Sequence, residues 1–295
     1  SLRPVAQGGN LIDFPYFEDM KYVVYTFQFT PLVDVKQMDL FEPTLQIRNE
    51  IMEHKLEYFE KALTSVKYYH GKKVYESSIQ VHHDNIMVMR LANRKPFVRE
   101  KAFHVMQDED EPSCGVIIDY RPEHQVIAIE DSRRAFENTD SVRNILERSL
   151  NGVLKQSRLK VSIKRQGLPS EFWDYVNQYR GRITEVRFTY QYPNLGRASE
   201  EMKKLLADTG KVVNSTESEV VFKGKSLEFD EKNEDIQSYT KDASKSGIPI
   251  KLKVKGVHKT LVTGNQTKQV DIEELDYEGD PLYFSKLKDS LDECL

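Results

Sequence analysis

The sequence has few of the features that mark disulfide frameworks, zinc sites or membrane spans. Its 295 residues include two cysteines, Cys114 and Cys294, which are widely separated and match neither a disulfide framework nor a zinc motif. No apolar run approaches the roughly 18 residues of a membrane span, and the first apolar cluster, residues 11–17, is broken by an acid and a proline. We therefore expect structural thiols, no membrane partner and a cytoplasmic location.

Motifs that indicate catalysis are also missing. There is no G-x-G-x-x-G sequence and no G-x-S-x-G sequence. Residues 224–226, GKS, match the end of a phosphate-binding loop, but that loop needs glycine where the chain has Glu219, so we interpret them as a turn. His82 and His83 are neighbours and would point to opposite faces of a strand, which is typical of a polar hairpin tip rather than a metal site. We therefore expect no cofactor and lean towards a protein without enzymatic activity.

Charge is nearly balanced over the whole chain but uneven along it. Aspartate and glutamate number 47 against 43 lysines and arginines, giving a net charge of −4. Two stretches nevertheless alternate between apolar and basic residues, and a period of two predicts strands with one basic face each. The first basic ladder is Arg158, Lys160 and Lys164, and the second basic ladder is Lys251, Lys253 and Lys255.

The ladders have a structural and a functional interpretation. In the structural one, exposed lysines fill a solvated sheet face and discourage edge-to-edge pairing. In the functional one, both ladders share a surface that binds a nucleic-acid backbone or an acidic protein. Arg180 and Arg182, beside the aromatic residues of 173–179, would extend that surface and add stacking. The tail from residue 271 has nine acids against two lysines, which equally suits a homo-oligomer in which this tail meets a basic face.

Periodicity predicts an α+β fold with mixed, mostly antiparallel sheets and helices packed on one face. Residues 1–19 are interpreted as an arm or a cloning remnant, and α+β regions follow at 20–135 and 136–295, as two domains or one. The acidic run 108–111 is expected to be a loop. Expected strands are 22–29, 74–81, 86–92, 97–105, 116–118, 126–129, 158–164, 184–190, 220–222 and 248–255, and expected helices are 43–63, 140–153, 169–179, 198–207 and 230–246.

Two acids at the ends of apolar strands suggest a metal-dependent nuclease as an alternative. Asp119 ends one expected strand and Glu130 the next, so a hairpin between them would let the two carboxylates approach and hold Mg²⁺ or Mn²⁺. The Glu-x-Lys triplets that such a site needs occur at residues 53–55 and 201–203, both on expected helices. Acids that simply terminate strands are the plainer interpretation.

The segment 182–194, RITEVRFTYQYPN, together with the helix and basic strand that start at Asp140, resembles uncharacterised bacterial proteins encoded in mobile-element and phage-defence neighbourhoods. The resemblance covers about a fifth of the chain and includes no diagnostic catalytic residue. It implies a role in conflict between a host and a phage or mobile element. The leading hypothesis is therefore a non-enzymatic binding module of such a system, with the nuclease and an oligomerising structural subunit as alternatives.

Overall fold

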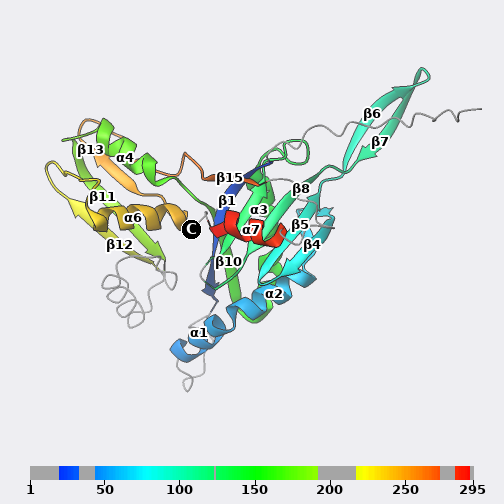
Figure 1. The fold of residues 1–295 in the computed structure, drawn as a ribbon, viewed down its shortest axis with the longest axis horizontal. Helices are drawn as coiled ribbons and strands as arrows, with labels where there is room; N and C mark the ends of the chain where they lie inside the picture. The colour runs from blue at the N-terminus through cyan, green and yellow to red at the C-terminus, as the bar shows by residue number, and fades with distance from the viewer. Residues whose placement is uncertain (1–19, 33–43, 123, 192–216, 273–282, 293–295) are drawn as a thin grey trace, which may run out of the picture.

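A seven-stranded sheet organises the larger of two lobes in the computed structural model (Figure 1). The structure describes residues 20–32, 44–122, 124–191, 217–272 and 283–292. Every pairing between its strands is antiparallel, which confirms the α+β class. The order is β10-β1-β9-β8-β5-β4, with β15 pairing the first residues of β1. These strands are β1 (Met20–Pro31), β4 (Ser77–His83), β5 (Ile86–Ala92), β8 (Ser113–Asp119), β9 (Val126–Glu130), β10 (Leu159–Arg165) and β15 (Gln269–Ile272).

Three helices cover one face of this sheet. They are α1 (Thr44–Glu53), α2 (Lys55–Ser65) and α3 (Thr139–Leu154). Alternate residues of β1, including Tyr25, Phe27 and Phe29, form the core beneath them. The expected helix over 43–63 is interrupted at His54, which leaves the helical conformation. The N-cap of α3 is Asn138, one residue earlier than expected, because its side chain accepts a hydrogen bond from the Ser141 N–H.

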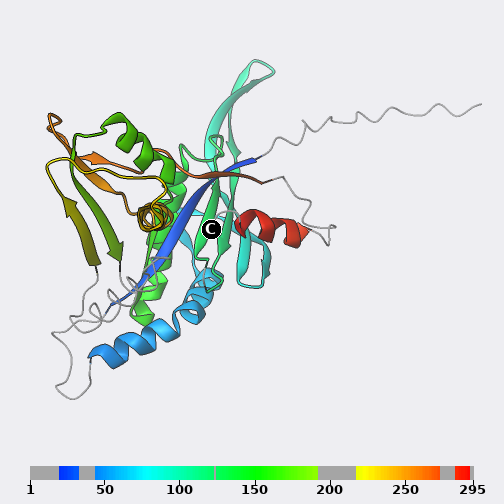
Figure 2. The same ribbon diagram turned by 60° about the vertical axis from the view of Figure 1, so that its left-hand side comes forward.

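The opposite face carries a helix that the sequence did not predict there. Helix α7 (Tyr283–Asp292) lays the buried Leu287 and Leu291 against β5, β8 and β9 (Figure 2). The expectation that helices lie on one face only is therefore wrong for this sheet. Its central strands are buried on both faces, which explains why β8 and β9 are continuous apolar runs rather than alternating ones.

A four-stranded sheet and two helices form the smaller lobe. The order is β12-β11-β13-β14, and α4 and α6 supply the apolar partners of its inner face. Phe172 of α4 and Tyr239 of α6 both pack against Phe188 of β11 with tilted rings, at centroid distances of 5.9 and 5.4 Å. The elements are β11 (Ile183–Gln191), β12 (Glu217–Lys223), β13 (Lys251–Val254), β14 (Leu261–Val262), α4 (Pro169–Gln178) and α6 (Glu234–Lys245).

Helix α3 and strand β10 lie beyond the predicted division at residue 135, yet they pack in the same core as β1. The chain passes to the smaller lobe after β10 and returns with β15, and Gly167 forms an isolated bridge with Thr267 where the two crossings meet. Among the described residues, no helix combines the length and the apolar character needed to cross a membrane. The expected helix at 198–207 lies outside the described residues.

Two small hairpins complete the fold. Strand β2 (Tyr68–His70) pairs with β3 (Lys73–Tyr75), and β6 (Lys95–Lys101) pairs with β7 (His104–Asp110). The expected strand over 97–105 and the expected acidic loop after it are both wrong, because the chain turns at Ala102 and Phe103. Both residues have positive φ, a conformation that favours glycine or asparagine, so the sequence carries no turn signal at this point. A short 3-10 turn, η2 (Lys155–Ser157), links α3 to β10.

Candidate anion-binding site

The first basic ladder lies on β10, at one edge of the large sheet. Lys160 is exposed and Lys164 is half-buried, and both point to the same side because they are an even number of residues apart. Arg158 is exposed and precedes the strand, with a left-handed φ of 52° that ends η2. The alternation predicted from the sequence is therefore confirmed for Leu159–Arg165.

The outer edge of β10 is closed by side chains of α3. The Asn151 carboxamide accepts from the Val161 N–H and donates to the Val161 carbonyl oxygen, both at 2.8 Å. The next outward-facing amide, Ile163 N–H, donates to the Glu147 carboxylate at 2.8 Å. These two side chains occupy the positions that a neighbouring strand would take, so the lysines of the first ladder are not needed to block pairing at this edge.

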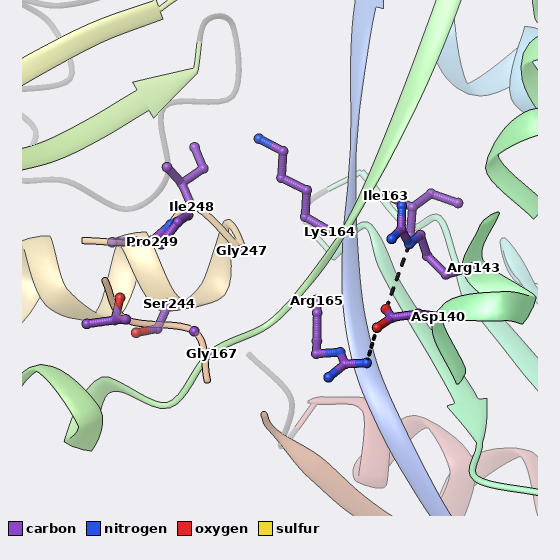
Figure 3. Close-up of a pocket in the computed structure, with 13 residues that line it drawn as sticks. Asp140, Arg143, Ile163, Lys164, Arg165, Gly167, Ser244, Gly247, Ile248 and Pro249 are labelled. Carbon is purple, nitrogen blue, oxygen red and sulfur yellow. Dashed lines mark hydrogen bonds and ion pairs between the residues drawn. The ribbon is translucent and has the colours of Figure 1, made fainter. Parts of the chain in front are cut away.

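Lys164, the last residue of the first ladder, lines a pocket between the two lobes. The pocket has a volume of about 380 Å³ (Figure 3). Its larger-lobe wall brings Arg143 of α3 together with Lys164 and Arg165 of β10, against one carboxylate, Asp140. The smaller-lobe wall includes the loop from α6 to β13, where Ile248 and Pro249 supply apolar surface, and Thr263, which follows β14 and supplies a hydroxyl group. The lining therefore has three basic side chains and one acid, and Arg143 also lies 3.9 Å from Glu147 of α3.

Asp140 organises this wall. It forms an ion pair with Arg165 and lies 3.9 Å from the Arg143 guanidinium. The Tyr25 hydroxyl donates to it at 3.0 Å and also hydrogen-bonds Thr139 at 2.8 Å, while the Arg165 guanidinium sits 5.8 Å from the Tyr25 ring centre. Burial raises the pKa of Tyr25 above its ordinary value, so the hydroxyl keeps its proton for Asp140. The carboxylate thus orients the two guanidinium groups.

Among the three basic side chains of the pocket wall, Lys164 has the fewest partners of opposite charge among the described residues. Burial lowers the pKa of its ammonium, and the acids that oppose this effect are Glu217 and Glu147. No hydrogen bond or ion pair joins its ammonium to another residue within the described part of the chain. Its stem packs against Gly247, where an added Cβ would lie 2.7 Å from the Lys164 Cβ. Figure 3 shows the side chain extending from β10 towards the loop that carries Ile248.

The second basic ladder lies in the other sheet, on β13, and its exposed face is not uniformly basic. Lys253 pairs in register with Glu185 of β11, and its ammonium donates to that carboxylate at 3.0 Å. Arg187, opposite Lys251, contacts Glu185 at 3.2 Å and Glu219 of β12 at 2.9 Å. The hydrogen bond from Lys253 lowers the pKa of Glu185, which keeps this acid charged. The sequence could not show these neighbours, because it does not say which strands pair with β13.

The remaining predicted binding residues gather at one end of the smaller lobe. The Arg182 guanidinium donates to the Lys255 carbonyl oxygen at 2.9 Å and lies 5.7 Å from the centre of the Tyr179 ring. Arg180 is exposed and lines a separate pocket of about 690 Å³ with Phe229. Arg182 thus contacts the backbone of Lys255, on a different sheet from the first ladder.

Asp119 and Glu130 do not converge. The β8–β9 hairpin pairs Asp119 with Val126, whereas the Glu130 carboxylate accepts from the Gly115 N–H at 2.6 Å, four residues further from the turn. At about 3.4 Å per residue the two acids stand roughly 14 Å apart. The expected approach is wrong because each residue of a hairpin pairs with the residue that lies equally far from the turn on the other strand. Asp119 lies next to the turn, whereas Glu130 lies at the far end of β9. Among the described residues, no group of three or more metal-ligating side chains comes together.

Asp119 instead helps to anchor α7. It is fully buried, and the Arg121 guanidinium donates to both of its oxygens, at 3.0 and 2.6 Å. His124 lies 3.1 Å from the same carboxylate, and Arg121 also reaches Asp292 of α7 at 2.7 Å. Buried carboxylates require such partners, so the placement has a structural cause.

Cys114 behaves as a structural thiol. Cys114 is fully buried, and burial raises the pKa of its thiol to about 12. A thiol with that pKa forms almost no thiolate at neutral pH, and the thiolate is the reactive form. Cys294 and much of the acidic tail lie outside the described residues.

Sequence reasoning identified Lys164 but missed Asp140, Arg143 and Arg165. The only available signal was the spacing of Asp140 and Arg143, three residues apart on a predicted helix and therefore on one face. A search of protein-family models finds no match to this sequence, and a search of curated proteins finds no significant similarity.

Proposed function

We propose that this chain is a non-enzymatic binding protein that holds the phosphates of a nucleic acid in its interlobe pocket and along the first basic ladder. The observation that carries the proposal is the grouping of Arg143, Lys164 and Arg165 around a 380 Å³ space with one acid on its wall. Burial removes water from around the Lys164 ammonium and lowers its pKa. A bound anion would stabilise this charge more than that of an exposed lysine, because water already solvates the exposed one.

The first ladder continues this positive surface away from the pocket. Lys160 lies on the same side of β10 as Lys164, about 14 Å away at four residues of strand, and Arg158 follows. An extended polyanion can follow such a line, whereas a compact anion would use the pocket alone. The guanidinium groups of Arg143 and Arg165 suit phosphate oxygens, which they can bind in bidentate fashion.

The proposal assigns no main role to the second basic ladder. Its charges face Glu185 and Glu219, so a polyanion would meet repulsion as well as attraction there. The setting in phage or mobile-element defence rests on the sequence resemblance of residues 182–194. The nuclease alternative required Asp119 and Glu130 to hold one metal ion together. The two residues lie at opposite ends of the β8–β9 hairpin, so this pair is not available to it.

The test measures binding of fluorescently labelled single-stranded DNA, RNA and duplex DNA to the full chain by anisotropy at low salt. We expect Lys164→Glu to weaken binding tenfold or more, since a charge-assisted hydrogen bond contributes about 1.5–3 kcal/mol. The matched control is Lys241→Glu, an exposed lysine on α6 outside the pocket, which makes the same change in net charge. We expect the control to change affinity less than about threefold.

Four results would overturn the proposal. The first is that the wild-type chain binds none of the nucleic acids. The second is that Lys164→Glu and Lys241→Glu weaken binding equally. Binding to polyglutamate without binding to any nucleic acid would favour an acidic protein partner instead. Cleavage of the probes with Mg²⁺ or Mn²⁺ present would restore the enzymatic alternative.

A further inference from the structure

Lys160 and Lys164 share one side of β10 but differ in exposure. Lys160 is exposed, whereas Lys164 is half-buried. The loop from α6 to β13 packs against this end of β10, since a Cβ added to Gly247 would lie 2.7 Å from the Lys164 Cβ and 2.7 Å from the Arg165 carbonyl oxygen. The two lobes therefore touch beside Lys164, and the first basic ladder runs from open surface into a corner between them.

The pocket at this corner is narrow. A cube with its volume of about 380 Å³ would have an edge of about 7 Å. The major groove alone of a B-form duplex is about 12 Å wide, so a duplex is too wide to enter the pocket. Figure 3 shows the Lys164 side chain extending towards the loop that carries Ile248. Only a ligand as narrow as one nucleotide chain can contact Lys164 from within the pocket.

The direction of the ladder favours the same kind of ligand. Side chains on one face of a strand form a nearly straight row, and Lys160 and Lys164 are about 14 Å apart along β10. A strand of a B-form duplex completes one turn in about 34 Å, so over this distance it passes about two fifths of the way round its axis. A flexible single strand can follow the row instead.

The smaller-lobe wall of the pocket offers a surface for a base. Ile248 and Pro249 line the pocket on that side, and Pro249 is exposed. The bases of a single strand are unpaired and can turn outwards, and apolar side chains pack on their faces. In a duplex these faces are stacked on the neighbouring base pairs. One basic wall and one apolar wall therefore match a phosphate and the base attached to it.

We infer that the interlobe pocket is selective for single-stranded nucleic acid, with one phosphate on Lys164 and the adjoining base against Pro249. This inference rests on the proposed function and narrows it to one class of nucleic acid. A duplex carries one charge per about 1.7 Å and attracts a basic surface more strongly than a single strand does. A preference for the single strand is therefore not explained by charge alone.

The experiment compares three DNA probes by fluorescence anisotropy with the full chain: a short single strand, its blunt duplex, and a duplex that leaves part of the strand as an overhang. We expect the single strand and the overhang to bind about tenfold more tightly than the blunt duplex, because only they gain the charge-assisted contact with Lys164. Lys164→Glu should remove this difference. Lys160→Glu is the matched control, since Lys160 is exposed to both forms and its loss should weaken both by a similar factor.

A second pair of variants tests the base contact. Pro249→Ser should weaken binding of the single strand about threefold or more, because less apolar surface is buried against the base. It should leave binding of the blunt duplex unchanged. Pro96→Ser is the control, at an exposed proline of β6 outside the pocket, and should change neither. A Pro249→Ser chain that binds the single strand as tightly as the wild type does would overturn the base contact.

The outcomes separate this inference from the proposed function. If none of the probes binds, the proposed function is wrong and the inference falls with it. If the single strand and the blunt duplex bind equally well and Lys164→Glu weakens both, the phosphate site stands and the single-strand selectivity is wrong. Tighter binding of the blunt duplex, or a selectivity that survives Lys164→Glu, also overturns the inference.

Discussion

At the residue scale, the function proposed here depends most on Lys164. It differs from the other lysines of the two ladders because it is half-buried and its pKa is lowered, whereas Lys160 and Lys251 are exposed. A lowered pKa means that the charge is present below that pKa and is lost as the pH rises through it. Lys164 should therefore lose its proton at a lower pH than an ordinary lysine, whose pKa is near 10.5.

This difference predicts the pH dependence of anion binding. As the pH rises from 7 to 10, we expect the wild-type affinity for an oligonucleotide to fall, whereas Lys164→Arg should retain its affinity because arginine stays charged up to about pH 12. The exposed Lys160→Arg serves as control and should follow the wild-type curve. Superimposable curves for the wild type and Lys164→Arg would show that Lys164 does not contact the anion.

At the element scale, β10 is held in place by α3 as well as by β1. Strand β1 pairs with one edge of β10, and Asn151 and Glu147 bond the other. The strand that carries Lys164 and Arg165 is thereby fixed relative to the helix that carries Asp140 and Arg143. The geometry of the pocket wall follows from this docking.

Removing the Asn151 carboxamide should destabilise the larger lobe. Asn151→Leu keeps a similar volume but leaves the Val161 N–H and carbonyl without partners, and each unsatisfied group costs about 1–3 kcal/mol. We expect the free energy of unfolding, measured by urea denaturation, to fall by about 2–4 kcal/mol. Asn144→Leu changes an exposed position of the same helix and should cost less than about 0.5 kcal/mol. Equal effects of the two substitutions would contradict the role given to Asn151.

The elements show which features the sequence specifies locally. The β4–β5 and β8–β9 hairpins and helix α3 were predictable, because hydrophobic period and turn residues such as Asp84 and Asn85 act over a few positions. The β6–β7 hairpin was not, because its turn uses Ala102 and Phe103 and its second strand ends in an acidic run. The position of α7 could not be predicted either, because the apolar stripe of a helix does not indicate which face of a sheet the helix covers.

The candidate site shows the same division at longer range. Alternation predicted that Lys160 and Lys164 share one side of a strand, which depends on that strand alone. It could not predict that β10 and β13 belong to different sheets, that Glu185 neutralises Lys253, or that Asp119 faces Val126 rather than Glu130. Each of these depends on strand pairing between residues far apart in the sequence.

At the scale of the whole molecule, the described residues form two lobes with separate cores, and the pocket lies where they meet. The β6–β7 hairpin projects from the larger lobe on the side away from the smaller one (Figure 1). This hairpin is therefore separate from the proposed anion-binding pocket.

The measurement that tests the central claim most directly is the salt dependence of oligonucleotide binding. For a single strand, the logarithm of the association constant falls against the logarithm of salt concentration with a slope of about −0.7 per phosphate contact. Contacts from the pocket cations together with Lys160 and Arg158 predict a wild-type slope of roughly −3 to −4, and Lys164→Gln should make it shallower by about 0.7. A wild-type slope near zero, or a slope that Lys164→Gln leaves unchanged, would contradict the claim that this pocket binds phosphate.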